Sequence, residues 1–197
     1  EKFKDGHTGK NFSVEEPKFV FKAPKFKERV KLPKCSEDPR PEGYLAARKL
    51  NPDKFYFAEE FKKYVNSKKK VFESTKHDEP RIIIPLYYKE SLIGIQGRSM
   101  DFGNPNSVKY ITVMFNDDAP KIYGLDNIRT DAPVYVTEGP FDSTFIRNSI
   151  AMCGADADVD RWGISNPVYI YDNEPRNREI VNRISKTIDR GYQVVIW

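Results

Sequence analysis

Two short segments rich in β-branched and aromatic residues, 134–137 and 168–171, constrain the fold of this chain more than any other feature. The pattern predicts a strand in each, and both strands end in carboxylates. The acidic residues that follow them are Glu138, Asp142, Asp172 and Glu174. Carboxylates at the end of a strand suit a divalent-metal site better than they suit a hydrophobic core.

The chain from residue 131 onward alternates predicted strands with predicted helices. Further strands are expected at 150–153 and 193–197, and helices near 141–148 and 177–190. This alternation predicts βαβ units, and therefore an α/β fold with a parallel sheet of about four strands flanked by helices. Ligands bind such sheets beyond the carboxyl ends of the strands, which is where the acidic residues lie.

Four carboxylates at close quarters repel one another unless cations neutralise them. Neighbouring parallel strands lie about 4.8 Å apart, so the two acidic strand ends can converge. Two or more divalent cations would balance the charge, with Glu138, Asp142, Asp172 and Glu174 as the ligands. Oxygen ligands with positions left for water favour Mg²⁺ or Mn²⁺ over zinc. The sequence therefore predicts divalent-metal phosphoryl chemistry.

The residues before this α/β region divide into three segments by composition. Residues 1–34 hold ten Lys or Arg against five Asp or Glu, interleaved with Phe and Pro, which predicts a basic linker. Such a linker could lie on the protein surface or contact nucleic acid through phosphates and stacking. Residues 35–75 predict a small helical segment, with one helix at 41–50 and a second that begins after Asn51.

Residues 76–130 predict a mixed β subdomain. Strand-like segments occupy 81–88, 92–96 and 110–115, and the short connection between the first two fits a hairpin turn. Pro85 inside the first segment predicts an edge position or a bulge, because proline cannot donate to a neighbouring strand.

Composition is typical of a soluble intracellular protein. No apolar segment is long enough to cross a bilayer, and the charged N-terminus does not resemble a signal peptide. Cys35 and Cys153 are the only cysteines, and neither lies near a histidine in the sequence. We expect both to be inert packing residues, because two distant thiols make neither a disulfide framework nor a zinc site.

The acidic motifs resemble those of the Toprim domain of primases and topoisomerases. That domain has Glu-Gly-x-x-Asp after its first strand, which Glu138-Gly-Pro-Phe-Asp142 matches. It has Asp-x-Asp after its third strand, where this chain has Asp172-Asn-Glu174, a change that keeps the charge and adds one methylene. The resemblance implies that these four acids bind metal and are catalytic.

Motifs upstream of the acidic region are similar to those of bacterial-type primases, and topoisomerases lack them. The matching segments are Arg81-Ile-Ile-Ile-Pro85, Gly94-Ile-Gln-Gly-Arg98, Lys109-Tyr110 and Ile122-Tyr-Gly-Leu125. Asp172-Asn-Glu-Pro-Arg176, together with the second of these segments, resembles the primases of T-even-type bacteriophages. The resemblance covers roughly residues 36–197.

This resemblance implies a DNA primase core that makes short RNA primers for DNA replication, from ribonucleoside triphosphates on a single-stranded DNA template. It implies that Arg81, Arg98 and Lys109 bind nucleotide or template phosphates. It also implies a replicative helicase as a partner and a location in the cytoplasm of the host cell, away from membranes. Residues 131–197 would be a Toprim domain truncated at its C-terminus, preceded by a mixed α+β basic subdomain.

Two departures from the family pattern limit this interpretation. Such primases begin with a zinc ribbon and have a Lys-Asp-x-x-Asp segment after the last Toprim strand, and this sequence contains neither. The expectation is therefore a polymerase-core fragment that holds no zinc and could be inactive on its own. A Toprim nuclease, which would use the same carboxylates to position water, and a non-catalytic DNA-docking module are the alternative interpretations.

Overall fold

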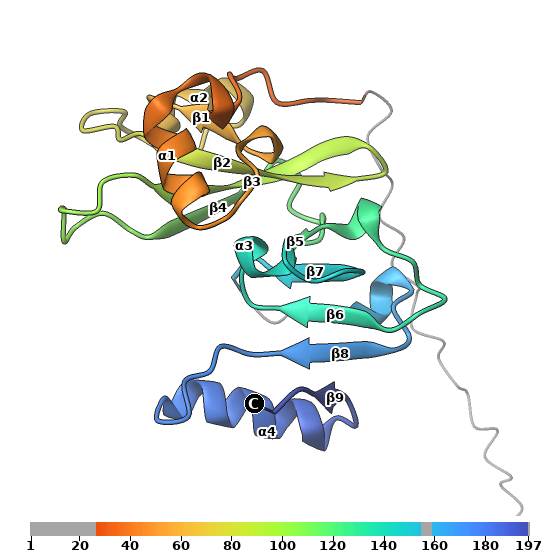
Figure 1. The fold of residues 1–197 in the computed structure, drawn as a ribbon. Coiled ribbons are helices and arrows are strands. Elements are labelled where there is room, and N and C mark those ends of the chain that lie inside the picture. Colours follow the sequence, from red (N-terminus) through yellow and green to blue (C-terminus); the bar gives the residue numbers. More distant parts are fainter. Residues whose placement is uncertain (1–26, 155–158, 197) are drawn as a thin grey trace, which may run out of the picture.

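The computed structural model describes residues 27–154 and 159–196, which form two β-sheets that lie one above the other in the view of Figure 1. Most of the basic linker predicted at 1–34 lies outside the described residues. No helix in the described part is both long and apolar enough to span a bilayer.

The first sheet has four antiparallel strands in the order β1-β2-β3-β4. Its strands are β1 (Tyr56–Ala58), β2 (Arg81–Tyr88), β3 (Ser91–Ser99) and β4 (Tyr110–Met114). The helices of this half are η1 (Cys35–Glu37), α1 (Pro39–Ala47), η2 (Pro52–Lys54) and α2 (Phe61–Lys68), where η denotes a 3₁₀ helix. The three strands predicted between 81 and 115 are therefore present.

The hairpin of β2 and β3 turns at Lys89 and Glu90, which both have positive φ, of 51° and 62°. Asp126 stabilises this strained turn: its two carboxylate oxygens accept the backbone N–H groups of Lys89 and Glu90, each at 2.7 Å. Because Asp126 lies between two strands of the second sheet, this contact joins the hairpin tip to that sheet.

Pro85 sits in β2 where its missing N–H does no harm. β1 pairs with β2 only from Arg81 to Ile83, so Pro85 has no partner strand on that side. The register with β3 then shifts between Leu86 and Tyr87. β2 is an inner strand, so Pro85 is unpaired only because β1 is short, and the irregularity lies one residue beyond it.

The second sheet has the order β5-β7-β6-β8-β9, with β5 antiparallel to β7 and the other four strands parallel. Its strands are β5 (Ile122–Tyr123), β6 (Val134–Thr137), β7 (Ser149–Met152), β8 (Pro167–Ile170) and β9 (Gln193–Val194). Its helices are η3 (Leu125–Asn127), α3 (Pro140–Ser143), η4 (Val159–Trp162) and α4 (Arg178–Asp189). The parallel sheet of four strands predicted from the βαβ pattern is present, with β5 added at one edge.

The helix predicted after Asn51 is wrong, because η2, β1 and α2 take its place. Phe55 and Phe57 lie two residues apart and are both buried in the same core cluster, which is the period of a strand. Asn51 still acts as an N-cap, since its side chain accepts the Asp53 N–H at 3.0 Å. The cap was predicted correctly, and the length of the helix was not.

The helix predicted near 141–148 is also shorter than expected, because α3 ends at Ser143. The hydroxyls of Ser143 and Thr144 donate back to the carbonyls of Pro140 and Phe141, at 2.8 and 2.7 Å. Such side-chain bonds compete with helix propagation. The chain therefore leaves the helix after Ser143 and reaches β7 at Ser149.

Phe141 joins the two halves of the protein. This residue of α3 is buried in the core cluster of the first half, with ring contacts to Phe55 at 5.2 Å and Tyr110 at 6.5 Å. The next residue in the chain is Asp142. The packing of one aromatic ring therefore fixes where a predicted metal ligand meets the first sheet.

Candidate active site

The carboxyl ends of β6 and β8 lie side by side at one edge of the second sheet (Figure 1). The two strands pair in parallel, with Thr137 opposite Ile170. Glu138 directly follows β6, and the backbone of Asp172, just beyond β8, lies close enough to lower the pKa of the Glu138 carboxyl. Two acids that are far apart in sequence are thus direct neighbours.

Asp142 reaches the same edge through a tight turn at Gly139. Its Oδ2 lies so close to Gly139 that a Cβ placed there would be 2.6 Å away. The φ of Gly139 is −113°, which any residue can adopt, so glycine is needed here for space and not for backbone freedom. Gly139 of the Glu138–Asp142 motif therefore leaves space for the carboxylate of Asp142.

Glu174 is held by the beginning of α4. Asn177, the N-cap of that helix, donates from Nδ2 to the Glu174 carboxylate at 2.6 Å and accepts the Glu179 N–H at 3.0 Å. The N–H of Glu174 donates to the carbonyl of Asp172 at 2.8 Å and closes the turn after β8. The helix cap thus also orients a predicted ligand.

The predicted acids share one electrostatic environment. Burial raises the pKa of Glu138, and the charges of Asp172 and Glu174 raise it further, against the lowering effect of Arg183. The pKa of Asp142 is also raised, first by the desolvating atoms around its carboxyl and then by the charge of Asp172, although part of the residue is open to solvent. The charge of Asp172 therefore acts on both Glu138 and Asp142. We call the four predicted acids at the carboxyl ends of β6 and β8 the acidic edge.

Cations of the protein itself balance part of this charge. Arg183 of α4 forms an ion pair with Glu138, and its guanidinium lies 5.2 Å from the centre of the Tyr171 ring. On the opposite side, Arg48 and Lys109 lower the pKa of Asp142. Arg48 follows α1, and Lys109 precedes β4, so both come from the half that contains the first sheet.

The carboxylate oxygens of the acidic edge are suitable ligands for a divalent cation, but their present rotamers do not bring them together around one. Among residues 27–154 and 159–196, no three acidic, histidine or cysteine side chains are gathered closely enough to bind one cation. Arg183 and Asn177 hold the carboxylates of Glu138 and Glu174. Because Asp172 raises the pKa of two neighbouring acids, added positive charge would be favourable here. As they stand, the carboxylates of Glu138 and Glu174 are therefore paired within the chain.

Arg98 approaches the acidic edge from the first sheet. Its guanidinium carbon lies 5.0 Å from the ring centre of Tyr110, 5.7 Å from Phe102 and 5.8 Å from Tyr44. Burial raises the pKa of Tyr110, while Arg98 lowers it and Asp142 raises it, so both charges lie within electrostatic reach of its hydroxyl. Arg98 and Asp142 therefore face the same region of the molecule.

Arg81, also predicted to bind phosphate, is fully buried in this structure. It forms an ion pair with Glu79 and donates to the carbonyls of Gly97 and Val108, each at 2.8 Å. A phosphate could reach it only if this network opened. Since Val108 directly precedes Lys109, Arg81 instead anchors the loop that presents Lys109.

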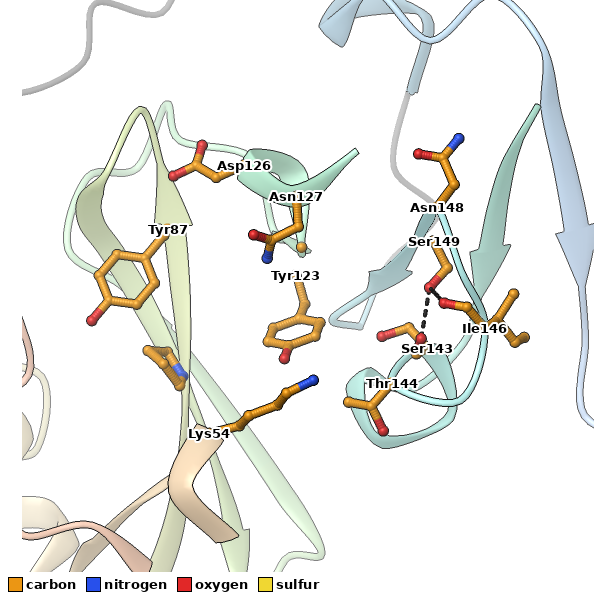
Figure 2. Close-up of a pocket in the computed structure, with 12 residues that line it drawn as sticks. Lys54, Tyr87, Tyr123, Asp126, Asn127, Ser143, Thr144, Ile146, Asn148 and Ser149 are labelled. Carbon is orange, nitrogen blue, oxygen red and sulfur yellow. Dashed lines mark hydrogen bonds between the residues drawn. The ribbon is translucent and has the colours of Figure 1, made fainter. Parts of the chain in front are cut away.

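A separate cavity of about 420 Å³ lies between β2, η3 and the α3–β7 connection (Figure 2). None of the four predicted acids lines it. Ser149 faces this cavity, but its hydroxyl is already bonded to the carbonyls of Ser143 and Ile146, at 2.6 and 2.8 Å. The cavity is therefore distinct from the acidic edge and offers little of the chemistry expected there.

Sequence reasoning missed Arg48 and Arg183. Arg48 is the C-cap of α1, and Arg183 lies in the middle of α4, so neither belongs to a motif. Their relation to Asp142 and Glu138 depends on how the helices pack. No local signal in the sequence could have identified them.

The fold is that of primase catalytic cores. The RNA polymerase domain of the Mycobacterium tuberculosis primase DnaG superposes with a TM-score of 0.58 at 15% identity, over 79% of this chain and 67% of that chain. The E. coli primase catalytic core gives a TM-score of 0.54 at 19% identity, over 79% and 63% of the two chains. At these identities the likeness establishes a shared mixed α/β fold.

The sequence adds a nearer relative. It is 36% identical to the DNA primase of Enterobacteria phage T4 in an alignment of 200 positions, which covers 96% of this chain and 58% of that protein. The chain is thus homologous to a phage primase and spans less than two thirds of its length. No protein-family model matches the sequence. The predicted resemblance to T-even-type phage primases is confirmed.

Proposed function

We propose that this chain is the RNA polymerase core of a DNA primase, which joins ribonucleotides into short primers on a single-stranded DNA template. One observation supports this most: an acidic edge faces basic residues of the other sheet, in a chain homologous to a phage primase. Under this proposal residues 131–197 are a Toprim domain, and residues 76–130 are the basic subdomain.

The acidic edge would hold Mg²⁺ or Mn²⁺ through Glu138, Asp142, Asp172 and Glu174. A divalent cation bound there would lower the pKa of the attacking 3′-hydroxyl and stabilise the departing pyrophosphate. The chain itself aims the ligands, since Gly139 leaves room for Asp142 and Asn177 orients Glu174. Arg183 would neutralise Glu138 until a metal replaces it.

The basic side would bind phosphates of the incoming nucleotide and of the template. Arg98 offers a planar, bidentate donor, and Lys109 and Arg48 offer positive charge next to Asp142. Arg81 would contribute indirectly, because its bonds to Gly97 and Val108 fix the loop that ends at Lys109. These residues position charge, which is the main requirement of phosphoryl transfer.

The test is primer synthesis by the intact protein with Glu138→Gln. We expect template binding to stay close to wild type, while primer synthesis falls by more than about 100-fold, because loss of a direct ligand costs more than loss of its supporting partners. Glu73→Gln, which removes an exposed acid of the first half, is the matched control and should remain active.

Three results would contradict the proposal. Normal primer synthesis by Glu138→Gln would show that the acidic edge does not take part in the reaction. Magnesium-dependent cutting of DNA by the unmodified protein, without primers, would show a Toprim nuclease. Template binding with no metal-dependent reaction of any kind would show a docking module.

A further inference from the structure

Phe102, in the loop between β3 and β4, exposes an aromatic ring on the basic side of the site. Its exposed fraction is 59%. The ring stacks on Tyr44, with centroids 5.0 Å apart and an angle of 22° between the planes. A single exposed aromatic residue is ordinary in a soluble protein, so its surroundings must decide whether it has a role.

The surroundings contain polar atoms that lack partners. Six side-chain nitrogen or oxygen atoms in the described residues are buried without a hydrogen bond, and three of them gather here: Tyr44 Oη, Arg98 Nε and Arg98 Nη1. Buried polar groups in native proteins almost always have a partner. Tyr44 and Arg98 therefore keep hydrogen-bonding capacity that no described residue uses, and an acceptor from outside the chain would reach these atoms once the side chains that cover them move.

A nucleotide of a single strand offers both groups that this cluster needs. Its phosphate oxygens accept hydrogen bonds from a guanidinium, and its unpaired base presents a flat face to an aromatic ring. Arg98 lies 5.7 Å from the Phe102 ring centre, so one nucleotide can contact both. Arg48, 5.6 Å from the Tyr44 ring, adds a second positive charge for the strand.

The position of Phe102 favours the template over the reacting nucleotide. Arg98 contacts the ring of Tyr110 at 5.0 Å, and Tyr110 contacts Phe141, the neighbour of Asp142, at 6.5 Å. Along this path, the side chains of Arg98, Tyr110 and Phe141 lie between a base on Phe102 and Asp142. The β3–β4 loop extends on the side of the molecule toward which β6 and β8 point (Figure 1). A DNA strand can therefore run from this loop to the carboxyl ends of β6 and β8.

We propose that Phe102 and Tyr44 form a stacking platform for one unpaired base of a single-stranded DNA template, whose phosphate is bound by Arg98. This platform rests on the proposed primase function and adds a contact that holds a template base without reading its identity. It assigns a role to an exposed ring and to buried polar atoms that the acidic edge does not explain.

The test measures binding of the intact protein to a fluorescent single-stranded oligonucleotide, with an abasic site at each position in turn. Wild type should lose affinity about tenfold at one abasic position, and Phe102→Ala should bind the complete strand about tenfold more weakly with no further loss at that position. Phe102→Trp should retain binding. Val108→Ala, which changes a residue with the same 59% exposure in the same loop, is the matched control.

The salt dependence separates stacking from charge. Arg98→Gln should reduce the slope of affinity against salt concentration, because it removes a phosphate contact, whereas Phe102→Ala should leave the slope unchanged. Unchanged thermal melting of Phe102→Ala would confirm that the exposed ring is not needed for folding.

Equal binding of Phe102→Ala and wild type at every position would overturn the platform, whatever Glu138→Gln does to primer synthesis. Loss of ribonucleoside triphosphate affinity in place of DNA affinity would overturn the assignment to the template. If wild type makes no primers but Phe102→Ala still loses the single-position effect, the platform stands and the primase proposal fails.

Discussion

The charged residues of the proposed site have different partners on the two sheets of this protein. On the second sheet, the acids Glu138 and Glu174 already have partners within the chain, in Arg183 and Asn177. On the first sheet, Arg98 keeps two buried donor atoms without a partner. Two of the four acids thus have partners within the chain before any ligand arrives, whereas these two donors of Arg98 do not.

This difference separates two ways of preparing a site. Clustered carboxylates repel one another, so without metal they need an internal cation to remain in place. A guanidinium among aromatic rings has no such repulsion. It can keep its position without a bound ligand, because the rings themselves attract it. We therefore expect substitutions on the acidic side to change metal affinity and those on the basic side to change nucleic-acid affinity.

The largest expected effect compares the two arginines of the first sheet. Arg81→Met should lower the free energy of unfolding by about 3–5 kcal/mol, because it leaves Glu79 without its counterion and two carbonyls without donors. Arg98→Met should cost only about 1 kcal/mol, since it loses contacts with aromatic rings but no hydrogen-bond partner of its buried donors. Urea unfolding of both variants measures this, and equal destabilisation would contradict the comparison.

Next in size is the effect of Gly139→Ala on the acidic edge. The new Cβ would lie 2.6 Å from Asp142 Oδ2, so the carboxylate must move. We expect manganese affinity to fall about 10- to 100-fold, as when a partner that orients a ligand is lost. Calorimetric titration of Mn²⁺ gives the value. Gly43→Ala, which meets no atom within 4 Å, is the control, and unchanged metal binding in both variants would refute the role of Gly139.

A smaller change is expected from Arg183→Gln. Removing this arginine frees Glu138 and removes a repelling charge, so Mn²⁺ should bind about fivefold more tightly in the absence of nucleotide, as for an ion pair worth roughly 1 kcal/mol. Lys186→Gln removes the same charge from the exposed side of α4 and should have little effect. Weaker metal binding by Arg183→Gln than by Lys186→Gln would show that Arg183 supports the metal and does not compete with it.

The smallest effect is expected at the cysteines, which are both buried. Burial raises the pKa of both Cys35 and Cys153 to about 12, from 9.0. The folded thiols should therefore resist a thiol reagent at pH 8 and react only after unfolding. Because ionisation favours the unfolded chain, stability should fall as the pH rises above 9. Rapid reaction of the native protein would contradict their burial.

Local patterns of the sequence predicted the second half better than the first. Each βαβ unit is continuous in sequence, so alternation predicted the strands that end at Glu138 and Asp172. In the first half, a helix was predicted after Asn51, and only the structure showed that Phe57 belongs to a strand that pairs with β2. Gly97 shows the same limit, since its need for space comes from Phe61, where a Cβ would lie 2.5 Å from the ring.

By itself the sequence determined the parallel sheet, the acids at its edge and the resemblance to phage primases, because these depend on local periodicity and motif spacing. Only the tertiary structure decided that Arg183 neutralises Glu138, that Arg81 is a buried anchor, and that Arg98 lies in an aromatic cluster with Phe102. These are contacts between elements far apart in the chain. Their charges become meaningful only when folding sets the distances and removes the water between them.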